Sequence, residues 1–173
     1  MQRSQARKVV FLGLMIGLAM GLHIFESLLP MPYLFPGAKL GLANIVSLFV
    51  IINYGFREAL FVTIVRTVLG SLMAGTFFNI TFFLSFSGGV FSTLVMGFLY
   101  VFVSEHLSLM GLSVLGAISH NLAQIAVAAY IVGTVGIIVY LPYLLVFAVP
   151  TGFFVGIVTG QLQRHAAIQR LRI

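Results

Sequence analysis

The basic residues of this chain fall almost entirely outside its long apolar segments. Of the 173 residues, 61% are hydrophobic and only 7% are charged. A soluble domain of this composition would expose apolar patches far larger than a monomer in water tolerates. The lipid bilayer is therefore the expected solvent for this chain.

Turn-forming residues divide the apolar sequence into segments long enough to cross a bilayer as helices. A crossing takes about 20 residues, so six helices with short loops use the whole length. We therefore predict an all-α integral membrane protein, a single transmembrane domain over residues 1–173. Residues 74–87 fit a loop, a half-helix or the start of the fourth helix, which ends near residue 103. The other predicted helices cover residues 9–29, 38–55, 57–73, 108–132 and 140–163.

The distribution of lysine and arginine predicts how the bundle is oriented. Cytoplasmic loops of membrane proteins carry an excess of these residues. Only Lys39 falls on the side opposite to the N-terminus. The positive charge thus predicts a multi-pass protein of the inner (cytoplasmic) membrane with both termini in the cytoplasm, and it indicates no binding to nucleic acid. The predicted cytoplasmic ends hold Arg3, Arg7, Lys8, Arg57, Arg164, Arg170 and Arg172.

The residues missing from the sequence restrict its chemistry. There is no cysteine, so disulfides, thiolate catalysis and cysteine-bound metals are excluded. There is no aspartate, and the acidic residues are Glu26, Glu58 and Glu105. Neither a serine–histidine–aspartate triad nor a Walker A sequence is present. We predict no enzymatic activity, no cofactor and no metal site.

Arg66 lies near the middle of the third predicted helix. A guanidinium inside the membrane is costly, so it is expected to face the bundle interior with a partner. Two interpretations remain open: an internal ion pair, or an anchor for an anionic or carbonyl-bearing ligand. Glu26 is the better partner, because Glu58 lies two turns away at the cytoplasmic rim.

The fifth predicted helix carries three polar side chains on one face. His120, Asn121 and Gln124 fall within about 100° of arc. Amide and imidazole groups at membrane depth are costly without partners. The cluster therefore favours a ligand-facing role, although a single histidine of this kind is more often a satisfied interior residue.

The segment 36–44, Pro-Gly-Ala-Lys-Leu-Gly-Leu-Ala-Asn, leads into the second predicted helix. Lys39 beside the helix N-terminus adds positive potential, so an anion could dock there. Alternatively, Lys39 extends to the lipid headgroups, which is the commoner arrangement at the end of a span. Asn44 follows within the same motif and is a candidate ligand contact.

Glycines recur at every fourth position on the first and last predicted helices. Such a face lets another helix approach closely in lipid. The contacting helix can belong to the same bundle or to a partner protein. The first helix carries Gly13, Gly17 and Gly21, and the last carries Gly152, Gly156 and Gly160.

The 36–44 motif and the run Ser-His-Asn-Leu-Ala-Gln at 119–124 resemble a bacterial membrane family with two names. These are the Gx transporter family and heptaprenyl diphosphate synthase component I. The six-helix layout and the small-residue face also resemble the S components of energy-coupling factor (ECF) transporters. This second resemblance implies a small vitamin-like or anionic substrate, bound near the outer face, and a small-residue face docked on a transmembrane coupling subunit driven by ATPases.

On that resemblance, our leading hypothesis is a substrate-binding subunit of transport. Gly13, Gly17 and Gly21 would form the partner interface. The alternative hypothesis is a membrane accessory subunit in isoprenoid or quinone metabolism, or in flavin- and quinone-linked electron transfer. This alternative predicts an apolar groove open to lipid. Prenyl diphosphate synthases resemble one another in aspartate-rich motifs that hold Mg²⁺, and a chain without aspartate cannot supply such a site. The predicted substrate-binding residues are Glu26, Lys39, Asn44, Arg66, His120, Asn121 and Gln124.

Overall fold

The computed structural model describes residues 2–28 and 40–170, and nearly all of them are helical. No strand occurs in this described part of the chain, so the prediction of an all-α protein is confirmed. The elements are α1 (Gln2–Leu28), α3 (Leu42–Tyr54), α4 (Phe56–Met73), α5 (Ile80–Val103), α6 (Leu109–Val132), the short 3₁₀ helix η1 (Val135–Tyr140) and α7 (Leu141–Arg170).

Four segments are long and apolar enough to cross a membrane, which supports a multi-pass membrane protein. The helix α4 has 18 residues but carries three charges, Arg57, Glu58 and Arg66. The helix α3 has 13 residues and is apolar. At 1.5 Å per residue it is about 20 Å long, shorter than the hydrocarbon layer of about 30 Å. The four candidate spans are Gln5–Glu26, Ile80–Val103, Leu109–Val132 and Val135–Ala166.

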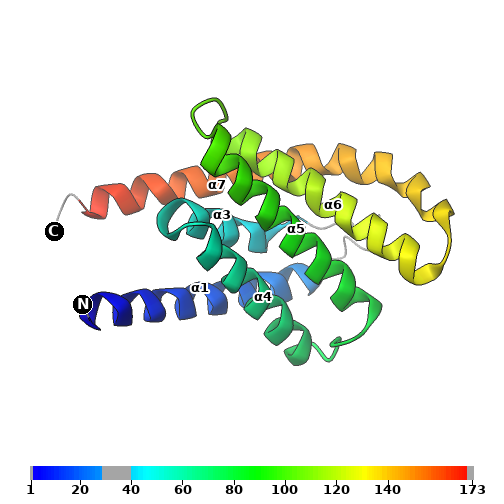
Figure 1. The fold of residues 1–173 in the computed structure, drawn as a ribbon, viewed down its shortest axis with the longest axis horizontal. Coiled ribbons are helices and arrows are strands. Elements are labelled where there is room, and N and C mark those ends of the chain that lie inside the picture. The colour runs from blue at the N-terminus through cyan, green and yellow to red at the C-terminus, as the bar shows by residue number, and fades with distance from the viewer. Residues whose placement is uncertain (1, 29–39, 171–173) are drawn as a thin grey trace.

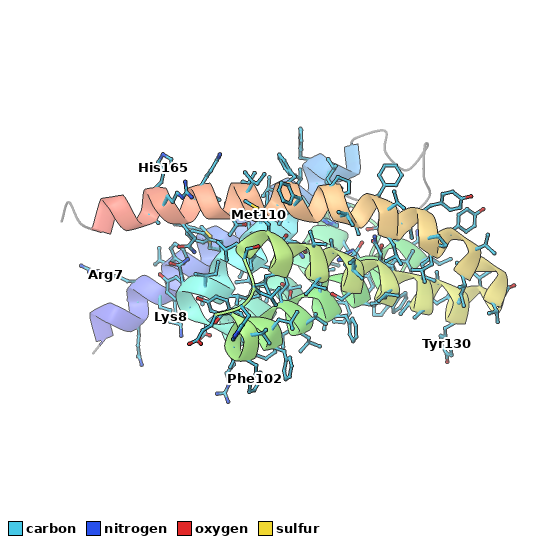
Figure 2. The ribbon with its side chains drawn as sticks, turned by 90° about the horizontal axis from the view of Figure 1, so that it is seen from above. Arg7, Lys8, Phe102, Met110, Tyr130 and His165 are labelled. Carbon is cyan, nitrogen blue, oxygen red and sulfur yellow. The ribbon has the colours of Figure 1, made fainter. Side chains whose placement is uncertain are left out.

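The helices run roughly side by side, with α3 enclosed among them (Figure 1). The helix α3 contacts α1, α4, α5 and α7, and most of its residues are buried. The first turn of α1 and the last turn of α7 lie toward the same end of the molecule (Figure 1). Figure 2 shows Arg7, Lys8 and His165 at this end and Tyr130 at the opposite one. We call it the basic end.

Residues 74–87, for which the sequence left loop and helix open, form a turn followed by a helix. A turn covers residues 74–79, and α5 begins at Ile80. Gly75 has a φ of 66° and Phe78 a φ of 61°, so the chain twice adopts the left-handed conformation here. The Asn79 side chain then accepts a hydrogen bond from the Ile80 amide and caps α5.

Two predicted helix ends differ from the structure. The first helix begins at Gln2 rather than Val9, and the last continues to Arg170 rather than Gln163. The added residues are rich in Gln, Arg and Ala, which are good helix formers, so both helices continue past their apolar parts. The remaining predicted spans agree with α3, α4, α5 and α6 to within one or two residues, except at the start of α3. That helix begins at Leu42 rather than near residue 38, because Gly41 has a φ of 73° and precedes the helix, and residues 38 and 39 lie outside the described part of the chain.

The two glycine faces have different surroundings. Gly152 and Gly156 lie against the backbone of α6, where an added Cβ atom would come within 2.6 Å of Val114 or Met110 Cα. They thus serve helix packing inside the bundle. The three glycines of α1 lie on its exposed side, and Cβ atoms added to them would meet no described atom within 4 Å.

Candidate functional site

Arg66 is buried in the interior of the bundle, as predicted. Only 4% of the residue is exposed. Its Nη2 atom donates a long hydrogen bond of 3.4 Å to Asn44 Oδ1 on α3. The Glu26 carboxylate of α1 is the charged group that attracts it electrostatically. Its Nε–H has no hydrogen-bond partner among the described residues. The guanidinium therefore keeps unused donor capacity inside the protein.

Glu26 ties the end of α1 to the start of α3. Its Oε1 atom accepts a hydrogen bond of 2.6 Å from the amide of Gly41, and the residue is 7% exposed. Gly41 immediately precedes α3 and has a φ of 73°, a conformation that favours glycine. A carboxylate at this position also stabilises the helix dipole of α3. Glu26 thus has a structural role whether or not it contacts a ligand.

Side chains from five helices meet at a small cavity of about 20 Å³. This volume suits about one water molecule. Arg66 and His120, from α4 and α6, both contribute to the wall. Four of the predicted residues, Glu26, Asn44, Arg66 and His120, thus line one cavity, which is small in the described part of the chain. The lining residues are His23, Glu26, Gly41, Ala43, Asn44, Arg66, Ser85 and His120.

His120 and Asn44 also line a second cavity of about 20 Å³, next to α7. Asn121 lies here too, and its Nδ2 atom donates a hydrogen bond of 2.8 Å to the Leu144 carbonyl of α7. This bond gives Asn121 a packing role between α6 and α7. Gln124 is 3% exposed and lines neither cavity, and its Oε1 atom has no hydrogen-bond partner among the described residues. Lys39 lies outside the described residues.

A chain of hydroxyl groups lies in the interior of the bundle, about one helical turn from Arg66 along α4. Ser47 Oγ is 2.9 Å from Thr63 Oγ1, which is 3.0 Å from Thr93 Oγ1. The Thr93 hydroxyl donates its proton to the Gly89 carbonyl, so it accepts a hydrogen bond from Thr63, which in turn accepts one from Ser47. These bonds connect α3, α4 and α5 in the interior. Ser47 and Thr93 were not among the residues predicted from the sequence, although serine and threonine at internal positions of apolar spans were the available signal.

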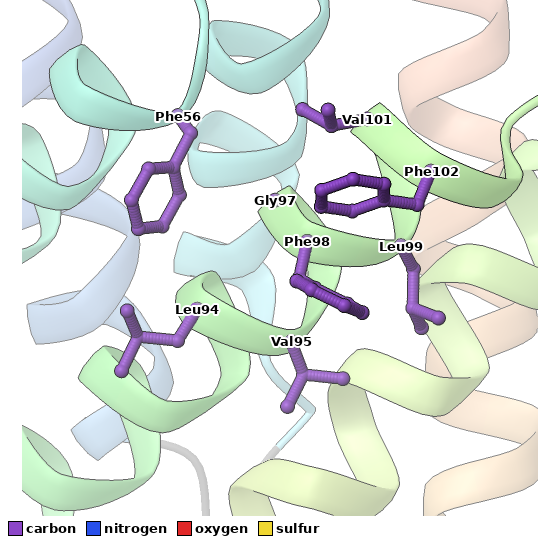
Figure 3. Close-up of a pocket in the computed structure, with 8 residues that line it drawn as sticks. All are labelled: Phe56, Leu94, Val95, Gly97, Phe98, Leu99, Val101 and Phe102. Carbon is purple, nitrogen blue, oxygen red and sulfur yellow. The ribbon is translucent and has the colours of Figure 1, made fainter.

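An apolar groove of about 540 Å³ lies on the side of the bundle and is open to the surroundings. Phe56 at the start of α4 projects toward the C-terminal half of α5 and forms one wall (Figure 3). Gly97 makes room for the Phe56 ring, since a Cβ atom there would clash with it. The residues that line this groove were not predicted from the sequence. The other lining residues are Leu94, Val95, Phe98, Leu99, Val101 and Phe102.

The groove and the buried charges lie at different levels of the bundle. Ser85 of the polar cavity and Leu94 of the groove are nine residues apart on α5, or about 14 Å along its axis. The groove is at the basic end, near the ion pair of Lys8 and Glu58. In this pair Lys8 donates a hydrogen bond to Glu58, and that bond lowers the pKa of Glu58. Glu58 lies in the first turn of α4, outside the candidate spans. The apolar and the polar sites can therefore serve separate purposes.

The fold and its cavities define a class: an all-α multi-pass membrane protein with a buried polar cluster and a lateral apolar groove. The sequence model of the family described as heptaprenyl diphosphate synthase component I matches residues 15–162. The chain belongs to this family. No curated protein and no solved structure matches it. Membership in a component family implies a partner subunit.

Proposed function

We propose that this chain is a membrane accessory subunit of isoprenoid synthesis, acting beside a separate prenyl diphosphate synthase. The observation that carries the proposal is the apolar groove of about 540 Å³ in a member of this family. A growing isoprenoid chain is apolar, so it leaves water for such a surface. The chain contains no aspartate to hold Mg²⁺ against a diphosphate, so it acts without catalysing the condensation itself.

The proposed topology has six crossings of the inner membrane, with both termini in the cytoplasm. The basic residues of the described helix ends support it, and so does the position of the turn between α3 and α4 toward the basic end (Figure 1). The short helix α3 crosses as an enclosed helix, shielded from lipid by α1, α4, α5 and α7. In this topology the groove opens in the cytoplasmic half of the bilayer, where a soluble synthase would release its product.

Co-purification tests the partner. The full chain is tagged, extracted from its native membranes in mild detergent and analysed by mass spectrometry. A tagged membrane protein of similar size from the same cells is the control. We expect enrichment of a prenyl diphosphate synthase, and a faster release of long-chain product by that enzyme when the chain is present. Enrichment of a transmembrane coupling subunit with ATPases would instead overturn the proposal.

A second candidate function is the substrate-binding subunit of an ECF-type transporter. The buried cluster of Glu26, Asn44, Arg66 and His120 favours it, because unused donors of a buried guanidinium suit an anionic ligand. This function requires the small cavity to widen. It predicts that a vitamin-like or other anionic nutrient binds the purified protein and that Arg66→Ala and His120→Ala weaken binding. If every nutrient that binds is indifferent to both changes, this second function is excluded.

A further inference from the structure

We infer that Arg57 completes the apolar groove into a site for a polyprenyl diphosphate, with the isoprenoid tail in the groove and the diphosphate at Arg57. This inference rests on the proposed function and names the ligand that the groove takes. It commits to an anionic amphiphile, in preference to a neutral prenyl alcohol or an ordinary phospholipid of the bilayer.

The walls of the groove suit an apolar tail. All eight lining residues are apolar or glycine. Phe98 and Phe102 lie one turn apart on α5, with ring centroids 4.6 Å apart, and 61% and 70% of their surfaces are exposed. From Leu94 to Phe102 the groove follows α5 for about 12 Å. A flexible chain lying along it would cover aromatic surface that α4 and α6 leave open.

The cation that follows a groove residue in the sequence suits an anionic head. Arg57 directly follows Phe56, which forms one wall, and its side chain is exposed. Arg57 makes no hydrogen bond or ion pair with any described residue. The neighbouring carboxylate, Glu58, is already held by Lys8. Arg57 is therefore available to a diphosphate, which a guanidinium binds with two parallel hydrogen bonds.

The charge balance of the basic end points the same way. The described cations there are Arg7, Lys8, Arg57 and Arg164, and the described acids are Glu58 and Glu105. Glu58 is paired with Lys8, whereas Glu105, in the turn after α5, makes no ion pair with a described residue. The surplus of positive charge complements a diphosphate at the membrane surface, while the isoprenoid tail of the ligand lies within the bilayer.

Binding to the full-length purified chain tests the inference. The protein is placed in phosphatidylcholine nanodiscs, and radiolabelled heptaprenyl diphosphate is compared with heptaprenol, which lacks the diphosphate. We expect the diphosphate to bind tighter, and Arg57→Gln to weaken its binding roughly tenfold, as for loss of a charge-assisted hydrogen bond. Arg57→Lys should recover part of the loss. Arg164→Gln, which removes another exposed charge at the basic end, should weaken binding much less than Arg57→Gln, because it lowers only the shared surplus of positive charge.

Two variants fill the groove without touching the charge. Leu94→Trp and Val101→Trp should each weaken binding of both the diphosphate and the alcohol. Leu115→Trp is the matched control, because Leu115 on α6 is 37% exposed, against 38% for Leu94, and lies outside the groove. Since the substituted side chains are exposed, all of these variants should keep the fold.

The outcomes separate this inference from the proposed function. Equal binding of diphosphate and alcohol, unchanged by Arg57→Gln, would overturn the head assignment. Binding that ignores both tryptophan variants, or that excess phosphatidylcholine abolishes, would overturn the groove assignment. If no prenyl compound binds while a prenyl synthase still co-purifies, the inference fails and the proposed function stands. If neither binding nor co-purification occurs, both fail.

Discussion

The glycine faces of α1 and α7 have the same spacing in the sequence and opposite surroundings in the structure. On α7, Gly152 and Gly156 bring the helix against the α6 backbone. On α1, the equivalent face of Gly13, Gly17 and Gly21 is exposed. A four-residue glycine spacing therefore identifies a face suited to close packing, but it does not identify the helix that packs there.

The two helices are also attached to the bundle in different ways. The helix α7 contacts α6 along its length and receives the Asn121 hydrogen bond. The helix α1 contacts α3 and α4, with Lys8 bonded to Glu58 near one end and Glu26 bonded to Gly41 near the other. The glycine contacts of α7 thus belong to the fold of this chain. The glycine face of α1 remains our predicted interface with a partner protein.

Gly156→Leu should cause the largest change, because the new side chain would have to displace the α6 backbone near Met110. Overpacking of this kind costs about 1–3 kcal/mol. The free energy of unfolding can be followed in detergent by circular dichroism. Gly160→Leu is the control, since its Cβ atom would meet a Leu109 side-chain atom at an ordinary 3.9 Å. Equal stability of the two variants would show that the α7 face does not depend on close approach.

Asn121→Leu should have the next largest effect. It removes the 2.8 Å hydrogen bond to the Leu144 carbonyl and with it a polar link between α6 and α7. The expected loss is about 1 kcal/mol in the free energy of unfolding, which chemical denaturation of the purified protein would measure. Thr151→Val is the matched control, because among the described residues the Thr151 hydroxyl bonds only to carbonyls of its own helix. A larger loss for Thr151→Val would contradict the assigned role of Asn121.

Glu58→Gln should have a small effect that depends on pH. The hydrogen bond from Lys8 lowers the pKa of Glu58 from its ordinary value of 4.5. A carboxyl group with a lowered pKa stabilises the fold above that ordinary value, and the contribution disappears as the pH falls through the folded pKa. Because Lys8 is 43% exposed, screening limits the effect to about 0.5 kcal/mol.

The measurement is the difference in unfolding free energy between the native protein and Glu58→Gln. It should be present at neutral pH and vanish on acidification below about 4.5. In a Lys8→Met background, the difference should be much smaller at every pH. A difference that grows as the pH falls would have the wrong sign for this ion pair.

The helix bounds were predicted well where a helix-ending glycine marks them. The predicted span 57–73 differs from α4 by one residue, because Gly55 ends the preceding helix with a φ of 101°. The sequence could not choose between loop and helix for residues 74–87, because the phenylalanines there suit both. The helix η1 has no equivalent among the predictions, which left residues 133–139 as a connection between the helices 108–132 and 140–163.

The candidate sites were predictable to different degrees. Burial of Arg66 and its attraction to Glu26 followed from the cost of a charge in the membrane. The bond of Asn121 to α7 did not, because spacing places a side chain on a face without saying which helix lies opposite. The groove beside Phe56 was not predictable either. It depends on which part of α5 its neighbours leave uncovered, and that is set by tertiary packing.

Gly17→Leu should leave the stability of the isolated chain unchanged, because its Cβ atom meets no described atom within 4 Å. The same substitution should reduce the amount of partner protein that co-purifies from native membranes, since a leucine would hold an approaching helix away. Leu115→Phe, at an exposed apolar position on α6, is the control for added bulk. If Gly17→Leu destabilised the isolated chain as much as Gly156→Leu, the α1 face would be an internal packing surface. If it altered neither stability nor co-purification, the exposed glycines would not be a docking surface, and the partner would have to contact the chain elsewhere.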